Sequence, residues 1–112
     1  MRKCVIVESP FAGDVERNLR YLRACLRDSL MRGEAPFASH GLYTQPGVLN
    51  DRIPEERLQG IHAGFSWHRH AARVVVYTDL GISDGMHKGI RNSEALHVPL
   101  EYRTLGGEWS QA

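Results

Sequence analysis

The sequence has few cysteines, little net charge and no long apolar run. Its two cysteines, Cys4 and Cys25, cannot build a disulfide framework or a zinc cage on their own. Fourteen Lys and Arg against thirteen Asp and Glu give a net charge of +1, which excludes a strongly basic nucleic-acid coat protein and an acidic tail protein. No apolar run approaches the ~20 residues of a membrane span, and the run before Glu8 is too short for a signal peptide. We therefore expect a reduced, cytoplasmic protein without membrane contact or direct nucleic-acid binding.

The composition is that of one globular domain. With 112 residues, 42% of them hydrophobic and 24% charged, the chain has room for one domain and enough apolar residues for one core. We expect this domain to span residues 3–104 and residues 105–112 to form a loose C-terminal tail.

Strand and helix signals alternate along the chain. Four short apolar runs predict strands, and three stretches with apolar residues at helical spacing predict the helices between them. The predicted strands are 3–7, 35–39, 73–77 and 98–103, and the predicted helices run from Asp14 to Gly33, from Pro54 to Ala72 and from Gly85 to His97. The predicted buried stripe of the first helix is Val15, Leu19, Leu22, Leu26 and Leu30. This order predicts an α/β fold, a parallel sheet of four or five strands with helices on both faces and strand 73–77 central.

Ligands of such sheets bind outside the carboxyl ends of the strands. Here those ends are residues 8–13, 40–43, 78–85 and the segment from Arg103 onward. Three carboxylates, Glu8, Asp79 and Asp84, follow the predicted strands.

Two segments at these ends have more than one interpretation. Ser83-Asp84-Gly85-Met86 precedes a helix, where a hydroxyl, an approachable backbone and the helix dipole favour an anion; the same pattern is also an ordinary helix cap. Phe11, in the turn after the first strand, places a ring beside a bound base or packs as a hydrophobic staple.

No pattern indicates a metal or a cofactor. His62, His68 and His70 lack the i, i+4 spacing and the accompanying carboxylate of a helical zinc site. The chain has no G-x-G-x-x-G dinucleotide fingerprint. We expect neither a metal nor a cofactor.

Several segments together resemble a known family. They are Glu8-Ser9-Pro10-Phe11-Ala12-Gly13-Asp14, Pro36 to His40, Arg57 to Gly60, Tyr77 to Met86, and Pro99. Over residues 3–104 the chain resembles a short member, of the phage or prophage type, of the nucleoside 2-deoxyribosyltransferase-like superfamily.

The resemblance implies a flavodoxin-like fold, a nucleoside or nucleotide ligand and chemistry at an N-glycosidic bond. It implies that Ser83 contacts the ligand's phosphate. It also exposes three departures: Gly89 stands where relatives carry the catalytic Glu, Ala72 where an Asp is usual, and Ile6 where a Tyr is common. The binding frame is kept, and three parts of the catalytic apparatus are missing.

We therefore expect a nucleotide-binding protein that holds its ligand without efficient cleavage, in a phage setting a sequestering protein in the host cytoplasm. The alternatives are a nucleotide N-glycosidase or deoxyribosyltransferase that uses Glu8, Asp79 or Asp84 instead, and an interaction module with a vestigial pocket. If there is room above Gly89, Gly89→Glu should raise base release. The residues expected to bind the ligand are Ser9, Pro10, Phe11, Gly13, His40, Asp79, Ser83, Gly85 and Met86.

A homodimer or larger assembly is also expected. Gly60 and Gly64, with Trp67 nearby, predict a helix face that a chain of this size does not cover by itself.

Overall fold

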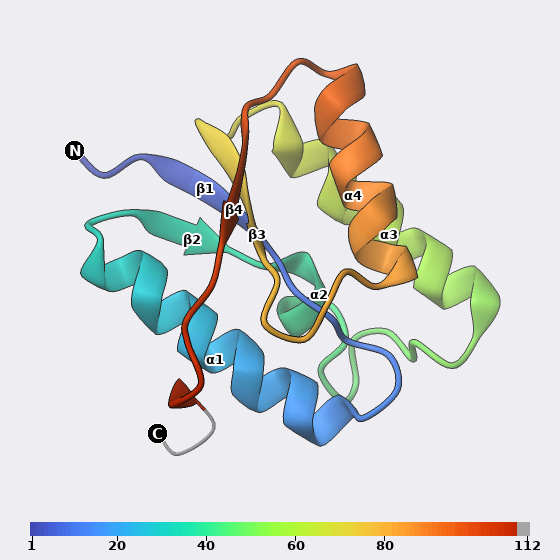
Figure 1. Cartoon of the computed structure of the whole chain (residues 1–112). Helices are drawn as coiled ribbons and strands as arrows, with labels where there is room; N and C mark the ends of the chain where they lie inside the picture. The colour runs from blue at the N-terminus through green and yellow to red at the C-terminus, as the bar shows by residue number, and fades with distance from the viewer. Residues whose placement is uncertain (110–112) are drawn as a thin grey trace.

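Four parallel strands form one sheet in the order β2-β1-β3-β4, as seen in a computed structural model that describes residues 1–109 (Figure 1). The strands are β1 (Cys4–Glu8), β2 (Ala35–Phe37), β3 (Arg73–Tyr77) and β4 (Leu100–Arg103). β1 pairs in parallel with β2 and β3, and β3 pairs in parallel with β4. The predicted α/β fold with a parallel sheet and β3 in its interior is confirmed.

The helices are α1 (Val15–Met31), the short α2 (Ser39–Leu42), α3 (Pro54–His68) and α4 (Asp84–Ala95). α1 covers one face of the sheet, and α4, with α3 beside it, covers the other (Figure 1). Between these layers Val74, Val75 and Val76 of β3 have no exposed surface, since alternate side chains enter opposite cores. The carboxyl ends of β1 and β3 therefore open between the helix layers.

α1 buries a face that matches the predicted stripe only in part: Leu22 is buried, and Leu19 and Leu26 pack against the core. Its buried residues are Asn18, Tyr21, Leu22, Cys25 and Ser29, while Val15 and Leu30 of the predicted stripe are 37% and 45% exposed. Polar side chains enter this core because they have partners: the Asn18 amide donates to the carbonyls of Phe11 and Ala12. A stripe chosen by apolar character alone misses such residues.

Arg103, at the end of β4, is buried in a cluster of polar side chains. It is 6% exposed, and its two terminal nitrogens donate to both Glu34 oxygens at 2.8 and 2.7 Å. It also donates to Glu101 and to the Tyr77 hydroxyl, and its guanidinium lies 5.8 Å from the Tyr77 ring centroid. The cluster ties the edge strand β4 to the turn after α1.

Two local predictions need correction. The second predicted helix ends at His68, not Ala72, because a turn at residues 69–72 leads into β3. Residues 105–109 are not a loose tail: Leu105 and Trp109 pack on the core, and the Trp109 ring lies edge-on to Tyr21 at 4.8 Å. The rest of the predicted tail, 110–112, lies outside the described residues. Of the two free cysteines, Cys25 is buried and Cys4 is exposed.

Within residues 1–109, none of the helices is both long enough and apolar enough to cross a membrane.

Candidate functional site

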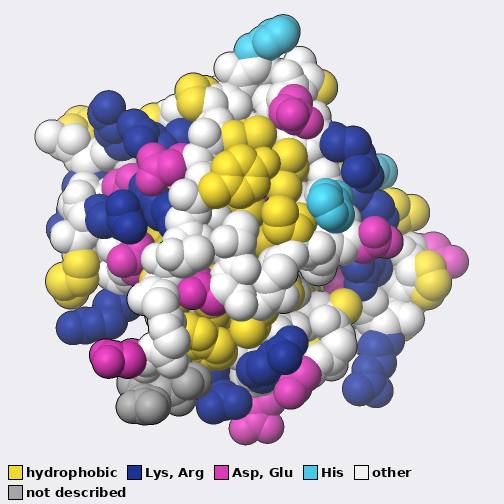
Figure 2. All heavy atoms as spheres, in the orientation of Figure 1, with side chains coloured by type: hydrophobic (Ala, Val, Ile, Leu, Met, Phe, Trp, Pro, Cys, Tyr) yellow, Lys and Arg dark blue, Asp and Glu magenta, His cyan; other side chains and the backbone are white. Residues whose placement is uncertain are grey.

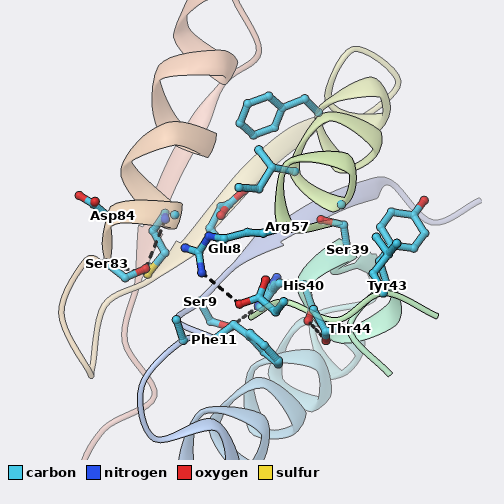
Figure 3. A pocket seen from close by; sticks show the side chains of 18 of the residues that line it. Glu8, Ser9, Phe11, Ser39, His40, Tyr43, Thr44, Arg57, Ser83 and Asp84 are labelled. Atoms are coloured by element: carbon cyan, nitrogen blue, oxygen red, sulfur yellow. Dashed lines mark hydrogen bonds and ion pairs between the residues drawn. The ribbon is translucent and has the colours of Figure 1, made fainter. Parts of the chain in front are cut away.

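A pocket opens at the carboxyl end of β1, between α2, α3 and the N-terminus of α4 (Figure 3). It encloses about 150 Å³. Eight residues from the sequence prediction line it together: Glu8, Ser9, Phe11, His40, Ser83, Asp84, Gly85 and Met86. Segments up to 78 residues apart in the sequence thus meet at the edge where the sheet topology places a ligand.

Three other predicted residues do not line this pocket. Pro10 is buried, and Gly13 lines a neighbouring hollow under the loop that precedes α3. The Asp79 carboxylate accepts hydrogen bonds from the Tyr21 hydroxyl and from the backbone N–H groups of Leu105 and Gly106. Burial opposes the ionised form, but these hydrogen bonds outweigh it and lower the pKa of Asp79. Asp79 therefore anchors the C-terminal segment and stands apart from this pocket.

Glu8 is the buried carboxylate of the pocket. Its side chain is 13% exposed and lies against the backbone of α4 at Gly89. A Cβ atom added at Gly89 would stand 2.3 Å from Glu8 Oε2 and 2.7 Å from its Cδ. The absent side chain at position 89 therefore leaves the room that the carboxylate of Glu8 fills.

This geometry corrects one sequence prediction. A gain of base release by Gly89→Glu needs free space above Gly89, and Glu8 occupies that space. A longer side chain at position 89 would displace Glu8, so we expect Gly89→Glu to disturb the site.

The contact can be tested by stability alone. We expect Gly89→Ala to destabilise the fold by about 1–3 kcal/mol through overpacking against Glu8, despite the ~1 kcal/mol that Ala adds to a helix. The loss should largely disappear in a Glu8→Ala background, a coupling of about 0.5–3 kcal/mol in a double-mutant cycle. Gly85→Ala is the matched control, because a Cβ at Gly85 meets nothing within 4 Å. Additive effects of the two substitutions in urea unfolding would contradict the contact.

Burial shapes the protonation of two pocket residues. It raises the pKa of Glu8 above its ordinary value of 4.5, and the neighbouring His68 only partly offsets the rise. It lowers the pKa of His40 to about 4, so this imidazole is neutral at pH 7. Ser9 Oγ lies 2.7 Å from His40 Nε2, which orients the ring in the pocket wall. The pocket thus holds one carboxylate in a weakly solvated setting.

Ser83 is the N-cap of α4. Its hydroxyl accepts a hydrogen bond from the backbone N–H of Met86 at 3.3 Å, and the Met86 sulfur lies 3.4 Å from the Ser83 nitrogen. Of the two interpretations of this segment, the structure shows the cap. The same cap lines the pocket, so the positive end of the α4 dipole faces the site.

The sequence prediction missed the residues that α3 and the preceding loop contribute. Arg57 reaches from α3 into the pocket, where its Nη1 lies 3.0 Å from Asp51 Oδ2 (Figure 3). His68, at the end of α3, is 2% exposed and its Nε2 lies 3.6 Å from Glu8 Oε2. Arg57 lay within a segment that carried the family resemblance, whereas His68 was considered only as a metal ligand.

No group of three His, Cys, Asp or Glu side chains close enough to hold a metal ion occurs among residues 1–109.

Of three comparisons with known proteins, the one with solved structures supports this fold. A family model described as "Domain of unknown function (DUF7768)" matches residues 3–103. No curated protein matches the chain. A solved structure of the 2-deoxyribosyltransferase from the psychrotolerant bacterium Bacillus psychrosaccharolyticus superposes with a TM-score of 0.67 and 17% sequence identity, over 94% of this chain and 74% of that one. At this identity the likeness shows a deoxyribosyltransferase-like, flavodoxin-like fold.

Proposed function

We propose that this chain, which belongs to the DUF7768 family, binds a nucleoside or nucleotide in its pocket and acts on the N-glycosidic bond through Glu8. The observation that carries the proposal is the Glu8 carboxylate, which lies in the pocket wall in the space left open by Gly89. The deoxyribosyltransferase-like fold supports the ligand class.

The pocket has the parts that such a ligand needs. Phe11, Ile61 and Phe65 supply apolar and aromatic wall for a flat base, and Ser9 and Ser39 supply hydroxyls for a sugar. Arg57 and the N-terminus of α4 supply positive charge for a phosphate.

Glu8 removes the reason to expect binding without cleavage. That expectation depended on the missing side chain at position 89, and the structure has a carboxylate from β1 in the adjoining space. An ionised Glu8 would attack the anomeric carbon as the carbon–nitrogen bond breaks, and the base would leave with the bonding electron pair and take up a proton. Water or a second, free base would then attack the anomeric carbon and give up a proton, and the ester bond would break with its electron pair restoring the carboxylate.

Titration calorimetry tests the binding half of the proposal. A panel of nucleosides and their monophosphates, with free bases and ribose 5-phosphate as controls, should contain at least one ligand that binds Glu8→Gln protein, in which cleavage is blocked. Absence of binding across the panel would contradict the proposed ligand class.

Ser83→Ala tests the phosphate end of the pocket. Loss of a charge-assisted hydrogen bond should weaken binding of a nucleoside monophosphate roughly tenfold, about 1.4 kcal/mol, and affect the free nucleoside much less. Ser66→Ala, which removes an exposed hydroxyl of α3, should change neither. Equal weakening of nucleotide and nucleoside would move the phosphate elsewhere.

Assembly into a homodimer or larger oligomer is a separate proposal. The sequence argument for it was an uncovered helix face at Gly60 and Gly64. That argument no longer holds, because Gly64 packs against Ser39 and Gly60 against Leu49 within the chain. The support that remains is apolar surface: Trp67 is 48% exposed, and Tyr102 of the edge strand β4 is 55% exposed. Figure 2 also shows apolar side chains gathered near the centre of the face that it presents. Light scattering should give a mass above that of one chain, and a monomeric mass would contradict this proposal.

We also propose that the protein works in the cytoplasm, on soluble ligands.

A further inference from the structure

Three side chains from three elements, Asn92, His68 and Glu8, contact one another in a row that ends at the Glu8 carboxylate. Asn92, on α4 one turn beyond Gly89, places its Nδ2 3.0 Å from Nδ1 of His68. The other ring nitrogen of His68, Nε2, lies 3.6 Å from Glu8 Oε2. The His68 ring is 2% exposed and packs at 5.4 Å, centroid to centroid, against the Phe65 ring. This row of side chains therefore runs from α4 through the end of α3 to the end of β1.

Asn92 sets the tautomer of His68. The Asn92 amide nitrogen can only donate, so Nδ1 of His68 accepts and carries no proton. A neutral His68 then holds its proton on Nε2, the atom that faces Glu8. The N–H dipole points at the carboxylate and favours its ionised form, the form that can attack carbon.

We propose that His68, oriented by Asn92, is a positioning residue that holds Glu8 ionised and fixed against α4 at Gly89. This inference rests on the proposed function, in which Glu8 is the reacting carboxylate. His68 itself touches no ligand in this scheme, because it acts through Glu8.

No other basic side chain competes for this role. Around the pocket stand His40 from α2, Asp51 from the loop before α3, Glu56 and Arg57 from α3, and Asp84 from α4. Arg57 is paired with Asp51, and burial keeps His40 neutral. Within residues 1–109, His68 is the one basic side chain within 4.0 Å of the Glu8 carboxylate.

An infrared titration of the carboxyl stretch tests the inference without any ligand. The band of protonated Glu8 is the one that Glu8→Gln removes. In His68→Gln its midpoint should move to higher pH, because the group that favours the ionised form is gone. Asn92→Ala should move the midpoint in the same direction. Without the Asn92 donor, neutral His68 can carry its proton on Nδ1 instead, and Nε2 then presents a lone pair to Glu8. His62→Gln, which changes an exposed histidine of the same helix, should leave the midpoint in place.

An unchanged midpoint in His68→Gln would overturn the inference, and an unchanged midpoint in Asn92→Ala would overturn the part played by Asn92. The milder Asn92→Ala keeps the test available if His68→Gln fails to fold. The titration is independent of the proposed function: a protein that binds no nucleoside but shows both shifts refutes the function and keeps the positioning.

Discussion

Glu8→Gln should lower base release by about a thousandfold or more, because glutamine has nearly the shape of glutamate but cannot attack or stabilise a developing positive carbon. Binding of the nucleoside should survive, since the rest of the pocket wall is unchanged. The loss should therefore fall on kcat, as measured by chromatography of the released base.

The same substitution should stabilise the fold at neutral pH. The folded-state pKa of Glu8 is raised above its ordinary value, so ionised Glu8 costs stability at pH values above the folded-state pKa. Gln removes this cost. The stability difference between Glu8→Gln and the wild type should shrink as the pH falls from the raised folded-state pKa toward 4.5, and it should be absent below about 4.5, where Glu8 is protonated in both states. A more stable and inactive variant is the signature of a carboxylate retained for function.

Two further variants, one a surface control and one at another candidate carboxylate, are compared with Glu8→Gln. Glu94→Gln, an exposed carboxylate on α4, should change neither stability nor base release. Asp84→Asn tests the second of the predicted candidate carboxylates that line the pocket. Full loss of activity in Asp84→Asn with little loss in Glu8→Gln would assign the chemistry to Asp84 and contradict the role of Glu8.

Arg103→Met should destabilise the protein by about 3–5 kcal/mol, because it leaves the Glu34 carboxylate without its cation in a mostly buried place. For a domain of this size the loss corresponds to a fall in Tm of roughly 10–20 °C. Arg23→Met, on the exposed face of α1, should change Tm little. A loss below about 1 kcal/mol in Arg103→Met would mean that the cluster behaves like a surface ion pair.

The Arg103 cluster also predicts how stability depends on pH. Hydrogen bonds from Arg103 lower the pKa of Glu34 and of Glu101 below 4.5. Their contribution is therefore fully present above about pH 4.5 and is lost as the pH falls through the lowered values. Arg103→Met should flatten this acid dependence of the unfolding free energy, most of it through Glu34, whose side chain is 14% exposed.

The sequence predicts the frame of the fold because its signals are local. The strand Arg73–Tyr77 matches residue for residue, since an uninterrupted β-branched run is buried on both faces. Ser83 caps the helix that the sequence predicts after it. The positions of most pocket residues follow from the topology, because the carboxyl ends of parallel strands meet at one edge.

The working arrangement of the site depends on contacts that no local pattern contains. Glu8 and Gly89 are 81 positions apart, and only the packing of β1 against α4 shows that one fills the space beside the other. Asp79 follows a strand as a catalytic carboxylate would, yet its carboxylate accepts hydrogen bonds from the Tyr21 hydroxyl and from the backbone of residues 105–106. The burial of His68 depends on α4, so its helix alone gives no sign of its role.

Base release by the wild type and by Glu8→Gln, measured side by side on the panel of nucleosides and monophosphates, tests the central claim most directly. We predict that the wild type frees the base from at least one of them and that Glu8→Gln binds the same compound without freeing it. Binding of that compound by the wild type with no base release above the Glu8→Gln level would contradict the claim and identify a protein that holds its ligand without cleaving it.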